Sequence, residues 1–442
     1  MSGFRVIVLG AGPAGLFTAH ALAAAGIDFV VLERQREIVR YKGALIVLWP
    51  PFVRLMDQLG MYEQLQKYST RFTTKTNFTH DGEPLCTGPI FAAAEDELGY
   101  PTLGLSRGNL LRILYENLPE HETRVRANTN AVNIETHKDG VRVHLADGSV
   151  VDGSIVIAAD GVHSPARELI QRLSRDSSAT GDLEATTPMV ATFMSLFGHT
   201  RGVREDVAVG DFAESHGPGI ASQSTRLDDT MYFTILKRLD KQTSDKSSFT
   251  SQDVDKFAQE MSDLTIYPGV KLKEVWPLRE HTNAVLLNQE EGLAKKWYHE
   301  RIVLVGDAAH KMTSINGQGA LSAVLSATAL VNNLQATLQK KPTPSTEDLE
   351  AAFAKYEASR MEVAGAVVDR GITVTRFITW SGEQDEAQDR ESSSKQDMVG
   401  EAKKRFVPAF SQSPILDFIP FEGKHGNTPW QMDGKLPIRP QL

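Results

Sequence analysis

A glycine-rich turn close to the N-terminus constrains the fold of this chain more than any other stretch. Residues 4–9 (FRVIVL) are typical of a buried parallel strand, and an Ala/Leu-rich helical pattern follows residues 10–15 (GAGPAG). In a turn of this spacing Gly10 permits the tight bend, Gly12 lets the backbone approach a pyrophosphate, and Gly15 lets the helix pack closely on the strand. The N-terminus of the helix also attracts phosphate charge.

A second predicted strand completes this motif. The helix is expected to end near Gly26, and residues 27–32 (IDFVVL) have the pattern of another buried strand. Glu33 stands at its tip, about twenty residues after the glycines, where an acid holds ribose hydroxyls. We therefore predict that a cofactor containing ADP-ribose binds here. The motif alone does not distinguish FAD from NAD.

Composition narrows the class of protein. A chain of 442 residues exceeds the length at which one hydrophobic core usually suffices, so two joined domains are expected. The net charge of −9 argues against nucleic acid as a partner. Cys86 is the only cysteine, which excludes an intrachain disulfide, a structural zinc cluster and a redox-active dithiol. No apolar stretch is long enough to span a bilayer, so we expect a cytoplasmic enzyme without a metal, acting on small molecules.

Acidic residues follow two further predicted strands. Residues 154–159 (SIVIAA) end in Asp160-Gly161, and residues 301–305 (RIVLV) end in Gly306-Asp307. The carboxyl end of a strand in an α/β sheet is a place where polar groups meet a ligand, although an ordinary β-turn is the alternative for Asp160. A long helix of small residues is predicted over 317–334, after the second of these strands.

Two stretches near the motif leave alternatives open. A helix is predicted to begin at residues 105–109 with Ser106 as its N-cap, and Arg107 in its first turn opposes the helix dipole. Such a cation either binds a ligand phosphate or lies on the solvated surface. The apolar run 43–49 (GALIVLW) is either a plain buried strand or a wall of the cofactor site.

The alternation of patterns predicts an α/β chain in which two units interleave. Strands are expected over VATFMSLFG, MYFTILKRL and VKLKEVWPL, with a hairpin turn at Asp81-Gly82 and a helix over 252–261. The predicted division is a cofactor-binding domain of residues 1–70, 101–175 and 286–375, a mostly antiparallel substrate-binding domain of residues 71–100 and 176–285, and a linker and tail of residues 376–442.

The C-terminal stretch and two histidines complete the expectations. Residues 381–396 (SGEQDEAQDRESSSKQ) are polar and are predicted to be a flexible linker or surface loop, and the tail from residue 406 is predicted to run extended over the surface. His216, in the polar stretch ESHGPG, is expected to be solvated, and His310 is expected to pack near the cofactor. The catalytic residue is unassigned.

The motifs together resemble a known family. The glycine turn ending in Glu33, the Asp160-Gly161 strand tip, and the stretches RIVLVGDAAHKMT and GQGA resemble the FAD-dependent class A aromatic monooxygenases of the para-hydroxybenzoate and salicylate hydroxylase kind. The chain looks most like the branch of fungal meroterpenoid and indole-alkaloid pathways. The resemblance implies a Rossmann-like FAD-binding domain of glutathione-reductase type interleaved with an antiparallel substrate domain, followed by a C-terminal helix and an extended tail.

The resemblance also implies an activity and a set of residues. It implies hydroxylation or epoxidation of a bulky apolar or aromatic substrate with molecular oxygen, with NADPH or NADH docking transiently because no second glycine motif is present. It implies that Glu33 binds the adenosine ribose, Arg107 the pyrophosphate and Asp307 the ribityl chain. The full set of expected cofactor-binding residues is Gly10, Gly12, Ala14, Gly15, Glu33, Arg34, Lys42, Val47, Arg107, Asp160, Asp307, Gly319 and Ala320.

The chain departs from the family pattern at several positions. Ser314 stands where the family has Pro, Leu321 where it has Asn, and Leu325-Ser326 where it has an acidic pair, while Met194 replaces an arginine of some members. These changes motivate two alternatives. The first is a flavoprotein that performs oxidase, cyclase or rearrangement chemistry, and the second is a non-catalytic FAD-binding protein.

Overall fold

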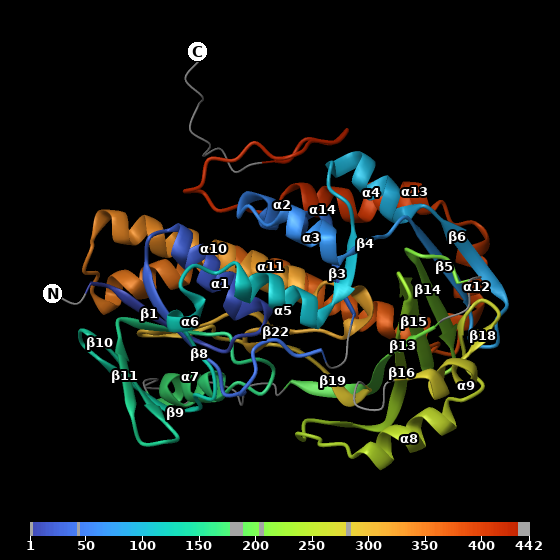
Figure 1. Cartoon of the computed structure of the whole chain (residues 1–442), viewed down its shortest axis with the longest axis horizontal. Coiled ribbons are helices and arrows are strands. Elements are labelled where there is room, and N and C mark those ends of the chain that lie inside the picture. Colours follow the sequence, from blue (N-terminus) through green and yellow to red (C-terminus); the bar gives the residue numbers. More distant parts are fainter. Residues whose placement is uncertain (1–2, 42–44, 177–188, 203–206, 280–283, 432–442) are drawn as a thin grey trace.

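A six-stranded sheet forms the centre of the larger part of the molecule (Figure 1). The computed structural model describes residues 3–41, 45–176, 189–202, 207–279 and 284–431. The strand order is β20-β21-β12-β1-β2-β8, and all neighbours are parallel except β20 and β21. The bounds are β1 Arg5–Leu9, β2 Asp28–Leu32, β8 Val125–Arg126, β12 Ile155–Ala158, β20 Tyr298–His299 and β21 Ile302–Leu304.

Both faces of this sheet are covered, which explains why its strands read as continuous apolar runs. Helix α1 (Pro13–Ala24) and helix α10 (Gly319–Lys340) lie on one face (Figure 1). On the other face lie helix α7 (Pro165–Asp176) and a small antiparallel sheet. That sheet contains β9 Ala131–His137, β10 Gly140–Leu145 and β11 Val150–Gly153. The predicted α/β fold is confirmed.

An eight-stranded, mostly antiparallel sheet forms the second part of the molecule. Its order is β22-β19-β13-β16-β15-β14-β5-β6, in which only β14 and β5 pair in parallel. The bounds are β5 Thr74–Thr79, β6 Pro84–Gly88, β13 Val190–Arg201, β14 Asp211–Gly217, β15 Ile220–Leu227, β16 Thr230–Thr243, β19 Val285–Leu293 and β22 His310–Lys311. The predicted turn at Asp81-Gly82 joins β5 to β6 as a hairpin.

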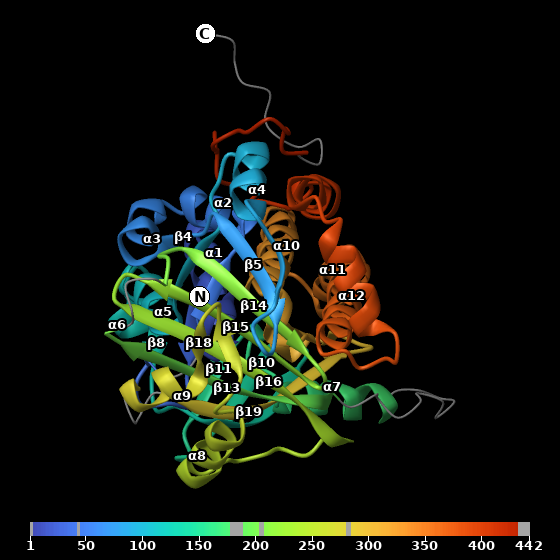
Figure 2. The ribbon, with the colours of Figure 1, turned by 90° about the vertical axis from the view of Figure 1, so that its right-hand side faces the viewer.

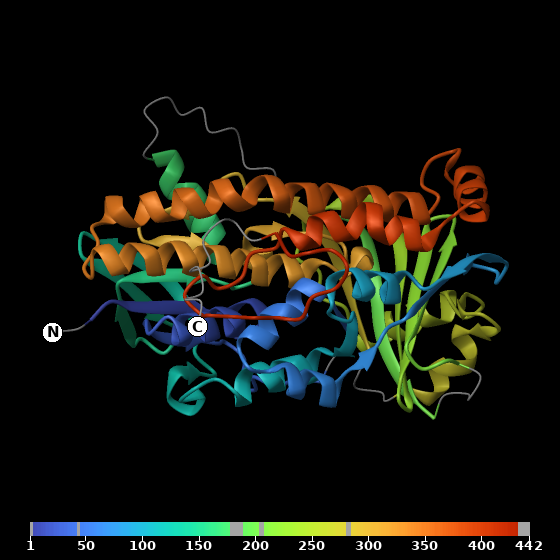
Figure 3. The same cartoon turned by 90° about the horizontal axis from the view of Figure 1, so that it is seen from above.

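The two faces of the eight-stranded sheet meet different partners. One face packs in an apolar cluster with helix α8 (Ser251–Glu260) and helix α9 (Leu272–Val275). The other face meets helix α12 (Asp385–Ser394) and the end of helix α11 (Thr346–Ile378). Figure 2 shows α11 and α12 on one side of the sheet and α8 and α9 on the other. Helix α11 lies beside α10 and reaches the eight-stranded sheet, so it connects the two parts (Figure 3).

The connecting segments form another small sheet, which contains β3 (Leu45–Leu48), β7 (Leu103–Ser106) and β4 (Thr70–Arg71). Helix α5 (Arg107–Glu116) follows β7, and Ser106 caps it as predicted by accepting a hydrogen bond from the N–H of Asn109. The other helices of this region are α2 Pro50–Gln58, α3 Tyr62–Tyr68, α4 Ile90–Leu98 and α6 His121–Arg124.

Two predictions of local structure are wrong. The stretch VKLKEVWPL is not one strand: β18 is only Val270–Lys271, and α9 begins at Leu272, because Leu272 and Val275 bury themselves with helical spacing. The polar stretch 381–396 is not a flexible linker, because α12 forms there and buries Asp389 and Ser393. Its packing face is polar, so apolar periodicity could not reveal it.

The C-terminal tail, predicted to be extended from residue 406, is helical as far as Ser411 and extended only from residue 412 to the end of its described part. After α13 (Met398–Glu401), a π-helical turn (Ala402–Phe406) and α14 (Val407–Ser411), residues 412–431 contain no helix or strand. This segment runs along the surface of the first part of the molecule (Figure 3). Side-chain and backbone bonds hold it there, including two between Gln58 and the backbone of Leu416 at 2.9 Å each.

Candidate functional site

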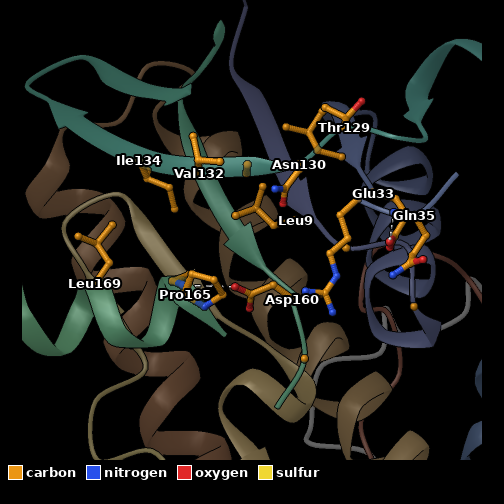
Figure 4. Close-up of a pocket in the computed structure, with 18 of the residues that line it drawn as sticks. Leu9, Glu33, Gln35, Thr129, Asn130, Val132, Ile134, Asp160, Pro165 and Leu169 are labelled. Carbon is orange, nitrogen blue, oxygen red and sulfur yellow. Dashed lines mark hydrogen bonds between the residues drawn. The ribbon is translucent and has the colours of Figure 1, made fainter. Parts of the chain in front are cut away.

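A cavity of about 480 Å³ lies at the carboxyl ends of β1, β2 and β12. The glycine turn and Glu33 line it, and Asp160 faces it from the tip of β12 (Figure 4). Val132 and Ile134 of β9 add an apolar wall. Of the predicted residues, the cavity collects Gly10, Gly12, Glu33, Arg34, Arg107 and Asp160.

The three motif glycines are required for different reasons. Gly10 has a φ of 96°, and a side chain there would also meet the carbonyl of Ala159. A side chain at Gly15 would collide with the carbonyl of Gly10. A Cβ on Gly12 would meet nothing closer than the Arg107 guanidinium, at 4.0 Å. The backbone at Gly12 therefore faces open space, as a site for a ligand group requires.

Two backbone N–H groups hold the Glu33 carboxylate in place. Its Oε2 accepts from Ala11 and its Oε1 from Gln35, both at 2.8 Å, and the residue is buried. Each carboxylate oxygen has two lone pairs, so one acceptor position on each remains for a ligand hydroxyl. The backbone of Thr129 donates to the carbonyl of Glu33 and brings the β8–β9 connection to the same place.

Two arginines at the cavity lack anionic partners. Neither Arg40 nor Arg107 makes a hydrogen bond or ion pair with a described residue, and Nε of Arg40 is buried without a partner. Burial and the charge of Arg40 lower the pKa of Arg107, against the opposing effect of Glu33 and Asp307. Positive charge that is half-buried and unpaired in this way is suited to a phosphate group.

Asp160 also has an unsatisfied acceptor. Its Oδ2 accepts from the N–H of Ala166 at 3.3 Å, whereas its Oδ1 is buried and has no hydrogen-bond partner in the described chain. Burial raises the pKa of Asp160. The carboxylate of an ordinary exposed β-turn would meet water at both oxygens, so the buried, unpartnered Oδ1 of Asp160 favours the ligand-facing alternative.

The tip of β21 brings a third motif to the same edge of the sheet. A Cβ on Gly306 would meet Ala14 of α1 at 3.0 Å and Ala323 of α10 at 3.2 Å, so this glycine lets both helix starts approach. Asp307 follows and accepts from Nζ of Lys311 at 2.7 Å. Asp307 does not line the cavity, but it lies close enough to Arg107 to affect the pKa of that side chain.

A turn of residues 314–317 connects this edge to α10 and carries Ser314. Gly317 has a φ of 60°, and its carbonyl accepts from Nε1 of Trp49 at 3.1 Å. A Cβ on Gly317 would meet Cβ of Val47 at 3.3 Å, so β3 packs directly against the 314–317 turn. The run 43–49 thus includes a strand and also borders the turn. Nothing lies within 4 Å of the Cβ position of Gly319, so the start of α10 is open.

The structure places the remaining predicted positions, and the positions that depart from the family pattern, in different parts of the molecule. Lys42 lies outside the described residues, and Arg34 is exposed at the lip of the cavity. Met194 packs with the α8–α9 side of the eight-stranded sheet, away from the 314–317 turn. Leu321 and Leu325-Ser326 are buried inside α10, so Ser314 is the one departure that lies in the turn itself.

The expectation that His216 is solvated is wrong, and the expectation that His310 packs near the cofactor stays a prediction. His216 lies in strand β14 and is buried between two carboxylates, with Nε2 at 3.1 Å from Glu214 and Nδ1 at 2.7 Å from Asp389. His310 is buried too, but its Nε2 meets the hydroxyl of Ser326 at 3.0 Å. Burial, with the charge of Arg360 as the second cause, lowers the pKa of His310 to about 4.

Several residues that line the cavity are not predictable from the sequence motifs. Arg40 lies in the polar stretch 34–42 (RQREIVRYK), where several cations close to a phosphate-binding motif are a signal. Asn130, Val132 and Ile134 come from β9 and the residue before it, whose sequence carries no ligand-binding motif. Their alternation gave no hint of which strand lies beside Glu33.

Comparisons with known proteins agree with this geometry. Residues 4–371 match a family described as FAD binding domain. The FAD-dependent monooxygenase srdH of Neurospora crassa is 37% identical over 440 residues, covering 97% of this chain and 98% of that protein. The FAD-dependent monooxygenase esdpE of Penicillium shearii is 33% identical over 386 residues, covering 84% and 78%.

Solved structures share the fold. The structure of HpxO from Klebsiella pneumoniae with FAD and uric acid has a TM-score of 0.74 at 22% identity, covering 92% of this chain and 97% of that one. No helix in the described part of the chain has the length and apolar character needed to cross a membrane. The extent and identity of the matches show that the chain belongs to the FAD-binding monooxygenase family, among fungal relatives.

Proposed function

We propose that the cavity binds the adenosine and pyrophosphate parts of FAD. The observation that carries the proposal is the pair of unpaired cations, Arg40 and Arg107, beside the open backbone of Gly12. A pyrophosphate would neutralise them and receive N–H groups from the start of α1. Glu33 would use its two free acceptor positions for ribose hydroxyls. Asp160 would accept from another hydroxyl or a bound water.

The rest of the cofactor would extend toward the 314–317 turn. Asp307 would accept from hydroxyls of the ribityl chain, with Lys311 fixing its orientation. The open start of α10 at Gly319 and Ala320 would present N–H groups to the electron-rich edge of the flavin ring. Val47 of β3 would border the ring. Arg34 at the lip and the close helix packing at Ala14 and Gly15 would complete the site.

We propose that the activity is hydroxylation or epoxidation of a bulky apolar or aromatic substrate, with NADPH or NADH and molecular oxygen. When bound, FAD would supply the redox chemistry, and the protein would bind, orient and shield it. The relatives named FAD-dependent monooxygenases support this proposal over an oxidase, a cyclase or a non-catalytic binding protein. Their fungal origin is consistent with secondary metabolism.

We also propose that the part with the six-stranded sheet binds the cofactor and that the part with the eight-stranded sheet binds the substrate. The substrate would meet the flavin where the 314–317 turn faces the eight-stranded sheet, since that turn is the part of the cofactor edge that contacts the sheet. Phe193 and Leu236 give this face apolar surface.

Anaerobic mixing of the purified yellow protein with NADPH tests the proposed activity. We expect the visible absorbance of the oxidised flavin to bleach, and to bleach faster when a true substrate is present. NADPH should be consumed as the flavin bleaches, and readmission of oxygen should then reoxidise the flavin and restore the colour. Flavin that NADPH and NADH both leave oxidised would contradict a monooxygenase and favour the non-catalytic alternative.

A further inference from the structure

Two glutamines attach the 314–317 turn to the eight-stranded sheet. The N–H of Ser314 donates to Oε1 of Gln289 at 3.0 Å, and Nε2 of Gln223 donates to the carbonyl oxygen of Ile315 at 2.7 Å. The Ile315 side chain is buried in an apolar cluster with Phe193 of the same sheet. The backbone of the turn is therefore held on both its donor and its acceptor side, around one apolar anchor.

The direction in which the Gln223 amide points is forced by its second partner. Nε2 also donates to Oε2 of Glu214 at 2.7 Å. If the amide were reversed, its oxygen would face a carboxylate and a carbonyl, and none of the three groups has a proton to donate. Glu214 therefore holds the Gln223 amide in the one orientation that binds the Ile315 carbonyl.

Glu214 belongs to a buried ionic network, which we define as Lys75, Glu214, His216 and Asp389. Nζ of Lys75 lies 2.6 Å from Glu214, and His216 bridges Glu214 to Asp389 of α12. Glu214, His216 and Asp389 are each at most 3% exposed. The network has two cationic and two anionic members when His216 is protonated. It anchors Gln223 from the side opposite the turn.

We propose that Gln223 and Gln289 are positioning residues, which keep the 314–317 turn in one geometry beside the flavin ring. The inference rests on the proposed function, because it takes the FAD ring to lie beside this turn. Neither glutamine touches the reacting atoms. Both act through the backbone of Ser314 and Ile315, and so determine how closely the turn shields the ring from water. Hydrogen bonds from the sheet to the backbone of the turn hold it in place on both sides.

The test uses Gln223→Leu, which keeps the approximate side-chain volume and removes both donated hydrogen bonds. The matched control is Ser224→Ala, on the opposite face of the same strand, where a buried hydroxyl donates to the carbonyl of Ile266. The first measurement is hydrogen exchange of the turn in flavin-free protein. We expect about tenfold faster exchange at residues 314–317 in Gln223→Leu, corresponding to the loss of one or two hydrogen bonds, and no change there in the control.

The second measurement is quenching of the bound flavin by iodide, read by fluorescence in the holoprotein. Greater quenching in Gln223→Leu than in both wild type and Ser224→Ala is the expected result. Equal exchange and equal quenching in all three proteins would overturn the inference while leaving the proposed function intact, since flavin would still be bound. Protein without flavin in every case would overturn the proposed function itself.

A second variant covers the case in which Gln223→Leu does not fold. Gln289→Leu removes the acceptor of the Ser314 N–H and leaves the buried ionic network untouched. It should raise exchange at Ser314 and iodide quenching in the same direction. No change in either quantity for Gln289→Leu would contradict the positioning role.

Discussion

Charged side chains are treated in opposite ways in the two parts of this molecule. In the eight-stranded sheet, Glu214 pairs with Lys75 and His216, and His216 pairs with Asp389 as well. At the cavity, Arg40 and Arg107 have no anionic partner in the described chain, and burial lowers the pKa of Arg107. A fully paired buried network holds structural elements together, whereas unpaired positive charge facing a cavity lowers stability until an anion binds.

The largest expected effect is on the paired side of this comparison. Glu214→Gln removes the anion that Lys75 and His216 share, so that Lys75 loses its anionic partner and His216 keeps Asp389 alone. We expect a loss of about 3–5 kcal/mol in the free energy of unfolding, measured by urea denaturation. Glu260→Gln, which breaks the exposed pair with Lys237, is the control and should cost less than about 1 kcal/mol. Equal losses of unfolding free energy in the two variants would show that the buried ionic network stabilises the protein no more than an exposed ion pair does.

The next effect is on the unpaired side. Arg107→Met should weaken FAD binding by about 1.5–3 kcal/mol, or roughly 10- to 150-fold in Kd, through loss of charge-assisted hydrogen bonds to the pyrophosphate. The stability of the flavin-free protein should stay the same or rise, because a half-buried cation near Arg40 is removed. Fluorescence titration and calorimetry measure the two quantities. Arg112→Met, on the exposed face of the same helix, should leave FAD affinity unchanged, and a weakening equal to that of Arg107→Met would refute the local explanation.

Stability should depend on pH through His216. The carboxylates of Asp389 and Glu214 raise the pKa of His216 despite its burial. Because the folded state binds this proton more tightly than the unfolded state, the stabilisation is complete below the unfolded pKa of about 6.5 and is lost as the pH rises through the folded value. Urea midpoints measured upward from pH 6 should therefore fall in wild type, and fall less in His216→Gln. Identical slopes would mean that His216 does not titrate in this range.

The smallest effect on stability is expected at an exposed turn that belongs neither to the cavity nor to the buried ionic network. Asp147→Ala removes the acceptor of the Ser149 N–H in the exposed turn between β10 and β11. The melting temperature should fall by about 2 °C or less, with FAD affinity unchanged. A measurable loss of flavin binding in this variant would show that residues outside the cavity contribute to FAD binding, which contradicts the proposed site.

Most of the cofactor side could be predicted because local backbone requirements determine it. Gly10 and Gly15 are needed for reasons that involve their immediate neighbours, so the spacing of the motif was enough. The places of Glu33 and Asp307 at the edge of the central sheet were predictable since each follows a buried strand, whereas their roles toward a cofactor stay predictions. Arg40 was not, because its role depends on where a loop folds back.

The buried ionic network of the eight-stranded sheet could not be predicted, for a different physical reason. His216 looks solvated in sequence, since the partners that bury it are Glu214 beside it and Asp389, which lies 173 residues away. Helix α12 carries Asp389 on a polar packing face, and a polar stretch of this kind resembles a linker. Long-range polar pairing has no sequence period, unlike the apolar periodicity of a helix or strand.

Titration of the flavin-free protein with FAD, and separately with riboflavin, tests the central claim most directly. The claim is that the unpaired cations beside the glycine turn receive a pyrophosphate. We predict one site that binds FAD at least about 100-fold more tightly than riboflavin, which lacks the pyrophosphate and the adenosine, and that Arg107→Met narrows this ratio. Equal affinity for the two ligands, or a ratio that Arg107→Met leaves unchanged, would contradict the account.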